Sequence, residues 1–302
     1  MSIPDIIVEN IWIPITIAAA AMQTARTTLQ KNLATNLSTN ASTLARYLYG
    51  LPIAMIYLVV VRAFDAAPQP DFNMTFALNI LMGGVAQIIA TSLLIMALTA
   101  RSYAVGTALS KTEAMQAALL AVVFLGEHLS WGGIVALLIS GVGVMTMSAP
   151  GKTWSFTIDR AAVYGLLSGT MFGFTAVGIR GANLALHTSF VTAAATTLAV
   201  MIVFQTIILG AYLIWFETPQ FRALLKAWRP SLGVGVFSAL GSIGWFTGMA
   251  LEKAAYVRTL GQVELVFTVL VARFYFRETL RPRELTGMVL IVAGIVILVL
   301  VA

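Results

Sequence analysis

The sequence has no cysteine and only two histidines, and this scarcity excludes several kinds of site. Without cysteine there is no disulfide bond or thiol nucleophile, and two histidines alone are too few for a structural zinc site. Both histidines, His128 and His187, are expected at helix ends or in loops, away from any buried serine. The aspartates all lie in the N-terminal tail or in expected loops, which excludes an intramembrane aspartyl pair. We therefore predict no enzyme activity, no metal and no cofactor.

Charge is also scarce, because only 10% of the residues are charged whereas 59% are hydrophobic. Soluble domains carry about 25% charged residues, so most of this chain must face lipid or other apolar helices. Ten apolar segments are each roughly long enough to cross a bilayer, and in hydrocarbon such segments must be helices. The predicted spans are 11–32, 41–62, 74–98, 102–125, 131–149, 161–183, 188–215, 231–251, 254–276 and 284–301.

Three further features are missing. The first ten residues carry Asp5 and Glu9 but no basic residue, which is unlike a cleavable signal peptide. No run of Lys and Arg is long enough to predict a nucleic-acid partner, although the net charge is +6. The tripeptide GKT at 151–153 imitates the end of a Walker A motif, but the first glycine of that motif would fall at Thr146. We expect no ATPase subunit, so any pumping must use gradients.

The chain contains an internal repeat. The stretch LSKTEAMQAALLAVVFLGEHL (109–129) aligns with LGQVELVFTVLVARFYFRETL (260–280), which places Glu113 opposite Glu264 at an offset of 151 residues. Two five-helix halves, 1–149 and 150–302, must enter the membrane from opposite sides because five is odd. Such inverted repeats are typical of secondary transporters, whose substrate site lies near the bilayer midplane. We expect the halves to form one compact membrane domain.

On these motifs the sequence resembles the EamA-like branch of the drug/metabolite transporter superfamily. Each unit has a glutamate at the end of its fourth helix and spaced glycines in its fifth; the matching residues are Glu127, Gly133, Gly141, Glu278, Gly287 and Gly294. The resemblance covers essentially the whole chain. It implies an all-α integral membrane protein of ten transmembrane helices, arranged as two five-helix inverted repeats around a central cavity. Many members have a proline early in the fourth helix of each unit, where this chain has Lys111-Thr112-Glu113 and Gln262-Val263-Glu264.

Charged residues interrupt the fourth predicted span. A charge near the middle of a membrane helix costs roughly 2.5–3.5 kcal/mol and faces the protein interior or water. Lys111 and Glu113 are two residues apart and do not face each other on a helix. We therefore predict that Lys111 pairs with Glu264 across the bundle, which leaves Glu113 to Arg26 or Arg258. The alternative is that these are fixed structural ion pairs with no role in transport.

Span one carries a polar stripe. Gln23, Arg26, Thr27 and Gln30 have the spacing of one helical face, which favours the wall of a water-filled cavity. The alternative is that the helix begins earlier, near Ile6, so that the stripe only reaches the headgroups.

The expected substrate site combines this stripe with the charges of spans four and nine. Arg26, Lys111 and Arg258 would hold an anionic group, whereas Glu113 and Glu264 would receive an amine, a proton or both. The predicted substrate-binding residues are Gln23, Arg26, Thr27, Gln30, Lys111, Glu113, Arg258, Gln262, Glu264 and Trp245. For Trp245, packing is at least as good an explanation as a cavity wall. We interpret Arg46 as an interfacial anchor, and Glu127 and Glu278 as residues that hold loops.

These residues favour a secondary transporter that moves small zwitterionic or anionic metabolites, such as amino acids, by alternating access, with export as the expected direction. Its expected partners are a small-molecule substrate and the lipid bilayer, with proton coupling open, and its expected location is the bacterial inner membrane. Two alternatives stay open: a proton-coupled exporter of organic cations, and a membrane scaffold or sensor that transports nothing.

The orientation in the membrane is also open. The loops on the side of the termini contain three Lys or Arg residues, and those on the other side contain ten. The positive-inside rule then places both termini outside the cytoplasm, whereas the family resemblance places them inside.

Overall fold

The computed structural model describes residues 10–99, 109–148, 160–274 and 282–301. Within these ranges the regular secondary structure is entirely helical. The helices are α2 (Trp12–Leu33), α3 (Thr39–Leu48), α4 (Leu51–Phe64), α5 (Met74–Thr99), α7 (Glu113–Leu125), α8 (Trp131–Ser148), α9 (Arg160–Ala185), α10 (Phe190–Phe216), α11 (Thr218–Lys226), α12 (Trp228–Leu251), α13 (Ala254–Leu260), α14 (Val263–Phe274) and α15 (Pro282–Val301).

These helices confirm the all-α fold of ten spans. α3 and α4 together form the second span, Thr39–Phe64, and α13 and α14 together occupy the ninth. Six of the described helices or helix pairs are long and apolar enough to cross a membrane, and α7 and α8 are shorter apolar helices. The short helix α11, between the seventh and eighth spans, was not expected. The beginning of span four (102–108) and Glu278 lie outside the described residues.

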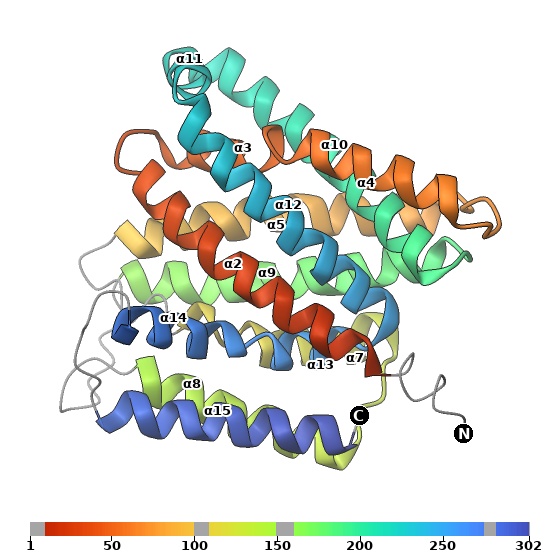
Figure 1. Cartoon of the computed structure of the whole chain (residues 1–302), viewed down its shortest axis with the longest axis vertical. Helices are drawn as coiled ribbons and strands as arrows, with labels where there is room; N and C mark the ends of the chain where they lie inside the picture. Colours follow the sequence, from red (N-terminus) through yellow and green to blue (C-terminus); the bar gives the residue numbers. More distant parts are fainter. Residues whose placement is uncertain (1–9, 100–108, 149–159, 275–281, 302) are drawn as a thin grey trace.

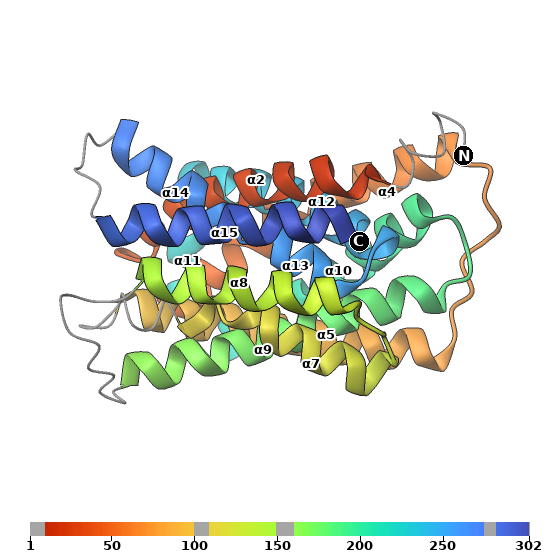
Figure 2. The same cartoon turned by 90° about the horizontal axis from the view of Figure 1, so that it is seen from below.

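The helix packing follows the two-fold relation of an inverted repeat. α2 packs on α12, which brings spans one and eight together, and α5 packs on α9, which brings together their counterparts, spans three and six. Three further contacts join counterparts directly: α8 with α15, α4 with α10, and α7 with α13. In Figures 1 and 2 the long helices run between the same two ends of the bundle, and α2 begins at the end where α15 finishes. In Figure 1, α8 and α15 form one edge of the bundle, while α4 and α10 lie toward the opposite edge.

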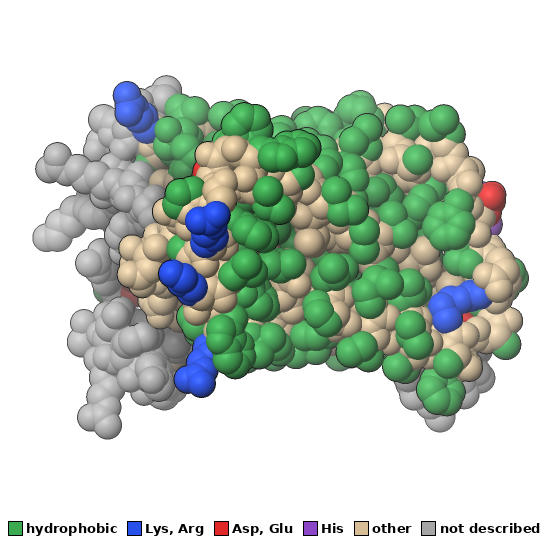
Figure 3. Space-filling model, turned by 90° about the horizontal axis from the view of Figure 1, so that it is seen from above, with side chains coloured by type: hydrophobic (Ala, Val, Ile, Leu, Met, Phe, Trp, Pro, Cys, Tyr) green, Lys and Arg blue, Asp and Glu red, His purple; other side chains and the backbone are tan. Residues whose placement is uncertain are grey.

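The outer surface has the pattern of a protein immersed in lipid. Large apolar side chains such as Ile56, Val59, Leu119 and Val289 are well exposed on it. Figure 3 shows one face of the molecule, with hydrophobic side chains across its middle and the visible Lys, Arg, Asp and Glu side chains near its two ends. Contiguous exposed apolar surface of this extent needs a lipid environment.

Glycines allow the central helices to approach closely. A Cβ atom on Gly178 of α9 would lie 2.7 Å from the Cα of Gly83 in α5. A Cβ on Gly169 would lie 3.0 Å from the backbone oxygen of Ser110, and one on Gly173 would lie 3.2 Å from the backbone nitrogen of Ala117. The glycines of span six therefore serve helix packing, as small residues commonly do in membranes.

Two carboxylates join spans two and seven at opposite ends of the bundle. Asp65, directly after α4, accepts a hydrogen bond from the hydroxyl of Ser189, the residue that caps α10. Hydrogen bonding, chiefly from Ser189, holds the pKa of Asp65 below its usual range. Glu217, directly after α10, accepts 2.6 Å hydrogen bonds from Ser38, which caps α3, and from Asn40. The two serines are 151 residues apart, which is the offset of the internal repeat, so the two carboxylate–serine contacts occupy equivalent positions in the two repeats. We call these two contacts ties.

The close approach of α5 and α9 leads to a first prediction. Gly178→Ala should lower the free energy of unfolding by about 1–3 kcal/mol, because the added methyl group meets the backbone of Gly83 in an already packed interface. Gly210→Ala is the matched control, since a Cβ there has no neighbour within 4 Å. Thermal unfolding of the two purified variants in detergent measures the difference. Equal melting temperatures would show that the contact is not tight.

A second prediction concerns orientation. If loop charge decides, both termini lie outside the cytoplasm, because ten of the loop cations are on the opposite side. A fluorescent protein that folds only in the cytoplasm, fused to the C-terminus, should then remain dark. A fluorescent fusion, together with proteolytic protection of the tag in intact cells, would contradict the charge rule for this chain.

Candidate functional site

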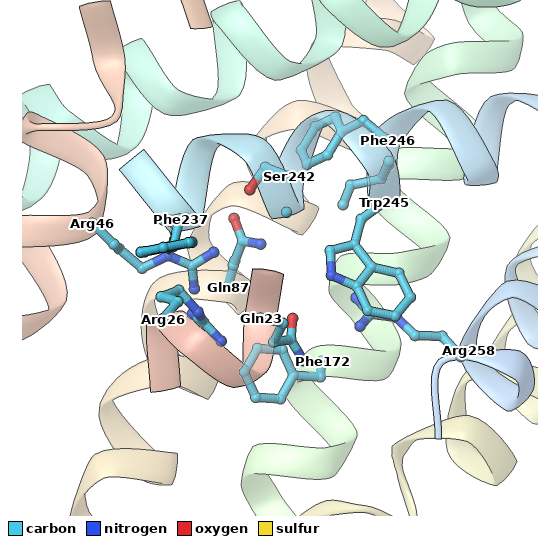
Figure 4. Close-up of a pocket in the computed structure, with 13 residues that line it drawn as sticks. Gln23, Arg26, Arg46, Gln87, Phe172, Phe237, Ser242, Trp245, Phe246 and Arg258 are labelled. Carbon is cyan, nitrogen blue, oxygen red and sulfur yellow. Dashed lines mark hydrogen bonds between the residues drawn. The ribbon is translucent and has the colours of Figure 1, made fainter. Parts of the chain in front are cut away.

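A cavity lies in the interior of the bundle and is lined by both repeats (Figure 4). Its lining residues come from α2, α3, α5, α9, α12 and α13; they are Gln23, Arg26, Arg46, Gln87, Phe172, Ile179, Phe237, Ser238, Gly241, Ser242, Trp245, Phe246 and Arg258. The cavity has a volume of about 20 Å³, which is room for about one water molecule. The cavity is therefore closed to a molecule of metabolite size, and side chains must move before one can enter.

Helix breaks lie beside this cavity. α13 ends at Leu260 and α14 begins at Val263, so the ninth span is interrupted at Gly261 and Gln262. In the first repeat α7 begins at Glu113, directly after a turn at 111–112, the equivalent position. A continuous ninth helix was predicted, and that prediction is wrong. Discontinuous helices near the midplane are a common device of transporter sites, because they expose helix ends to the ligand.

The indole ring of Trp245 explains why the break contains a glycine. A Cβ atom on Gly261 would overlap this ring, so a larger residue would push Trp245 out of place. The break places Glu264 in the first turn of α14, as Glu113 is in the first turn of α7. Helix N-termini favour negative charge, which stabilises both carboxylates there.

The predicted pairing across the repeats is confirmed. Lys111 Nζ lies 2.7 Å from Glu264 Oε2, and the same oxygen accepts a 2.8 Å hydrogen bond from the amide of Gln23. Of the two partners considered for Glu113, the structure selects Arg258, at 3.5 Å. The guanidinium of Arg258 also lies over the ring of Trp245, 4.9 Å from its centroid. Each glutamate is thus paired with a cation of the other repeat.

Two buried arginines have no such partner. Arg26 and Arg46 are 4% and 5% exposed, and no described carboxylate lies within ion-pair distance of either. Arg46 donates hydrogen bonds to the hydroxyls of Ser238 (3.1 Å) and Thr91 (3.0 Å), and Arg26 reaches Thr27 at 3.5 Å. The interpretation of Arg46 as an interfacial anchor is therefore wrong, because helices α5 and α12 enclose it.

The polar stripe of span one divides between two environments. Gln23 and Arg26 line the cavity. Gln30 instead donates a 3.0 Å hydrogen bond to the backbone oxygen of Ser42, and with Thr27 it borders a separate small pocket. Arg26 and Gln30 are buried, and Gln23 and Thr27 are partly buried. Two of the four residues, Gln23 and Arg26, therefore lie on the wall of this cavity, and Thr27 and Gln30 do not.

The remaining predicted residues lie beside the cavity or beyond it. Lys111, Glu113 and Glu264 are not among its lining residues, and Glu264 reaches it through Gln23. Gln262 is buried at the helix break, and neither its amide oxygen nor its amide nitrogen has a hydrogen-bond partner. Outside the cavity, Glu127 forms a 3.1 Å ion pair with Arg180 of α9, in keeping with a structural role.

Sequence analysis missed several lining residues besides Arg46. Gln87 is a lone amide in an apolar span, and its oxygen accepts a 2.7 Å hydrogen bond from Gln205. A polar side chain in the middle of a membrane helix was the signal that could have found it, as for the charged residues. Ser238 and Ser242, one helical turn apart on α12, carry a weaker signal of the same kind.

These features define a class of protein. An inverted repeat of membrane helices, broken helices at equivalent positions and a charged cavity between the repeats are features of membrane transporters. Among the described residues, no group of three His, Asp or Glu side chains could hold a metal ion.

Comparison with known proteins identifies the family. The chain matches the EamA-like transporter family over residues 10–149 and again over 159–300. It therefore belongs to this family of membrane transporters, and each repeat corresponds to one copy of the family's unit. A search of curated proteins found no match. A solved structure titled "Crystal structure of protein" has a TM-score of 0.62 at 13% identity, covering 94% of this chain and 99% of the other, which supports the fold.

The two ion pairs lead to a third prediction, on stability. Glu264→Gln should lower the free energy of unfolding by about 3–5 kcal/mol, because it leaves Lys111 as a buried charge without its partner. Glu113→Gln is the matched change at the equivalent position. Its effect should be smaller, since the distance to Arg258 is longer and the contact of Arg258 with Trp245 remains.

Thermal unfolding of the purified variants measures both effects. The double variant Lys111→Met/Glu264→Gln should regain most of the lost stability, because it removes both charges together. Equal losses for the two single variants, or no recovery in the double variant, would contradict the assignment of Lys111–Glu264 as the main stabilising pair.

Proposed function

We propose that the chain is a secondary transporter of small zwitterionic or anionic metabolites, such as amino acids, and that it exports them by alternating access. The observation that carries this proposal is the cation-rich cavity between the repeats, with three arginines among its lining residues: Arg26, Arg46 and Arg258. Guanidinium groups bind carboxylates with paired hydrogen bonds, which makes a carboxylate the natural ligand of such a cavity.

The glutamates supply the other half of a zwitterion site. Glu113 and Glu264 lie at the helix breaks next to the cavity, and both are held by cations of the opposite repeat. A substrate amine can replace one of these cations without leaving a carboxylate unpaired. The same two carboxylates are the buried groups to which a coupled proton would bind.

Alternating access fits the closed cavity. A space for about one water molecule does not admit a metabolite, so the substrate requires a conformation that opens to one side. Both ion pairs join the fourth span of one repeat to the ninth span of the other, so relative movement of the repeats changes these pairs directly. The location that we propose is the bacterial inner membrane.

Transport by the purified protein in liposomes tests this function. We expect exchange of labelled neutral amino acids or small carboxylic acids across the liposome membrane, driven by substrate or proton gradients. Uptake of tetraethylammonium alone would favour an exporter of organic cations. Absence of transport and of binding for all three classes of compound would favour a scaffold or sensor. Accumulation by inverted, but not right-side-out, membrane vesicles would support export.

A fourth prediction concerns Arg26. Arg26→Gln should weaken the binding of a transported carboxylate by about 1–3 kcal/mol, because it removes one charge-assisted contact. Arg222→Gln is the control, since Arg222 is an exposed arginine of the short helix α11. Titration of purified protein followed by intrinsic fluorescence measures the affinity. Unchanged affinity in Arg26→Gln would exclude this residue from the site.

A further inference from the structure

We propose that the cavity takes a substrate with two negative charges, either two carboxylate groups or one phosphate group. This inference rests on the proposed function, in which the cavity is the substrate site. It goes beyond that function because it assigns the charge of the ligand. The basis for this charge is the pair of buried guanidinium groups that have no described carboxylate partner.

The buried charges beside the cavity do not cancel. Four described cations lie in or next to it: Arg26, Arg46, Lys111 and Arg258. Only two carboxylates, Glu113 and Glu264, face them, and each is already paired with a cation, Arg258 and Lys111 respectively. Two guanidinium charges therefore remain without a carboxylate.

The contacts of these two arginines do not replace a counter-charge. Arg46 has two hydroxyl acceptors and lies over the ring of Tyr47, 5.1 Å from its centroid. Such contacts orient a guanidinium but leave its positive charge in place. Among the described residues, the hydrogen-bond contact of Arg26 is the 3.5 Å contact with Thr27. Both side chains are more than nine-tenths buried, where an uncompensated charge costs several kcal/mol.

Hydrogen-bond donors at the cavity also favour an anionic ligand. The indole Nε1 of Trp245 and the Nε of Arg258 are buried N–H donors that find no acceptor in the described part of the chain, and both residues line the cavity. A buried donor without a partner is unfavourable, so an arriving ligand gains by supplying acceptors. Anionic oxygens supply both the missing charge and the missing acceptors.

The arrangement of the side chains suits a dianion. In Figure 4, Arg26 and Arg46 approach the cavity together on one side, while Trp245 and Arg258 lie on the other side. A dicarboxylate can place one carboxylate between Arg26 and Arg46 and direct the other at Trp245 and Arg258. A phosphate can instead bind the guanidinium groups of Arg26 and Arg46 with its one dianionic group. A monoanion would leave one of the two buried charges uncompensated.

Binding of four probes to the purified full chain tests the proposal. Succinate has two carboxylates, butyrate has the same carbon chain with one, inorganic phosphate represents a single dianionic group, and alanine is a neutral zwitterion. At mildly alkaline pH, where inorganic phosphate is mostly the dianion, succinate or phosphate should bind at least about tenfold more tightly than butyrate. Tighter binding of succinate would identify a dicarboxylate as the preferred ligand, and tighter binding of phosphate would identify a phosphate group.

Variants separate the role of the arginines from a role in folding. Arg46→Gln should weaken the preferred dianion by about tenfold or more, while butyrate binding changes much less. Arg222→Gln should leave all four affinities unchanged. Without ligand, the melting temperature of Arg46→Gln should be equal to or higher than that of the parent chain, because an unbalanced buried charge has been removed. The double variant Arg26→Gln/Arg46→Gln should no longer distinguish succinate from butyrate.

Several outcomes would overturn the inference. If butyrate or alanine binds as tightly as both dianions, the cavity does not select for two negative charges, although the proposed transport of anions or zwitterions still stands. If Arg46→Gln weakens every probe equally and lowers the melting temperature, Arg46 is structural. If none of the four probes binds and none is transported, both this inference and the proposed function fail.

Discussion

The ion pair between Lys111 and Glu264 is the interaction on which the centre of this bundle depends. An ammonium and a carboxylate in a membrane interior are tolerated only if each has a partner, and here the partners come from different repeats. Gln23 adds a hydrogen bond from α2 to the same carboxylate oxygen, so three separate spans meet at Glu264. Any conformational change that separates the repeats must provide a new partner for each charge.

The two ion pairs are reciprocal but not equivalent. Each repeat contributes one cation and one carboxylate, yet Lys111 lies at a helix turn, whereas Arg258 lies in α13, before the break. The distances differ accordingly, at 2.7 Å and 3.5 Å. The two repeats therefore have equivalent backbone folds, but the cations of their ion pairs do not lie at equivalent positions. The free energy needed to break one pair therefore differs from that needed to break the other.

The fold and the pairing of Lys111 with Glu264 could be predicted from the sequence. The helix break and the residues that line the cavity could not. The spans follow from apolar length, and the Lys111–Glu264 pair follows from the repeat offset together with helical geometry. The break at Gly261 and Gln262 was not predicted, and the reason for a glycine there is the indole ring of Trp245, which is distant in sequence. The burial of Arg46 is equally invisible, since it depends on helices α5 and α12, which lie far along the chain. Pattern alone predicted the polar face of span one but not which half of it reaches the cavity.

The closed cavity at the centre and the carboxylate–serine ties at the two ends of the bundle together indicate which parts of the protein can move. Asp65 with Ser189 joins spans two and seven at one end, and Glu217 with Ser38 joins the same spans at the other. Both ties are present together in a conformation whose cavity is closed. Separating these spans at either end would break the carboxylate hydrogen bonds there and leave the opposite tie intact. Movement at the helix break of span nine breaks neither tie, but it changes the positions of Arg258 and Glu264 relative to the cavity. The charged centre, rather than the tied periphery, is therefore where a bound substrate can most directly change the free energy of opening.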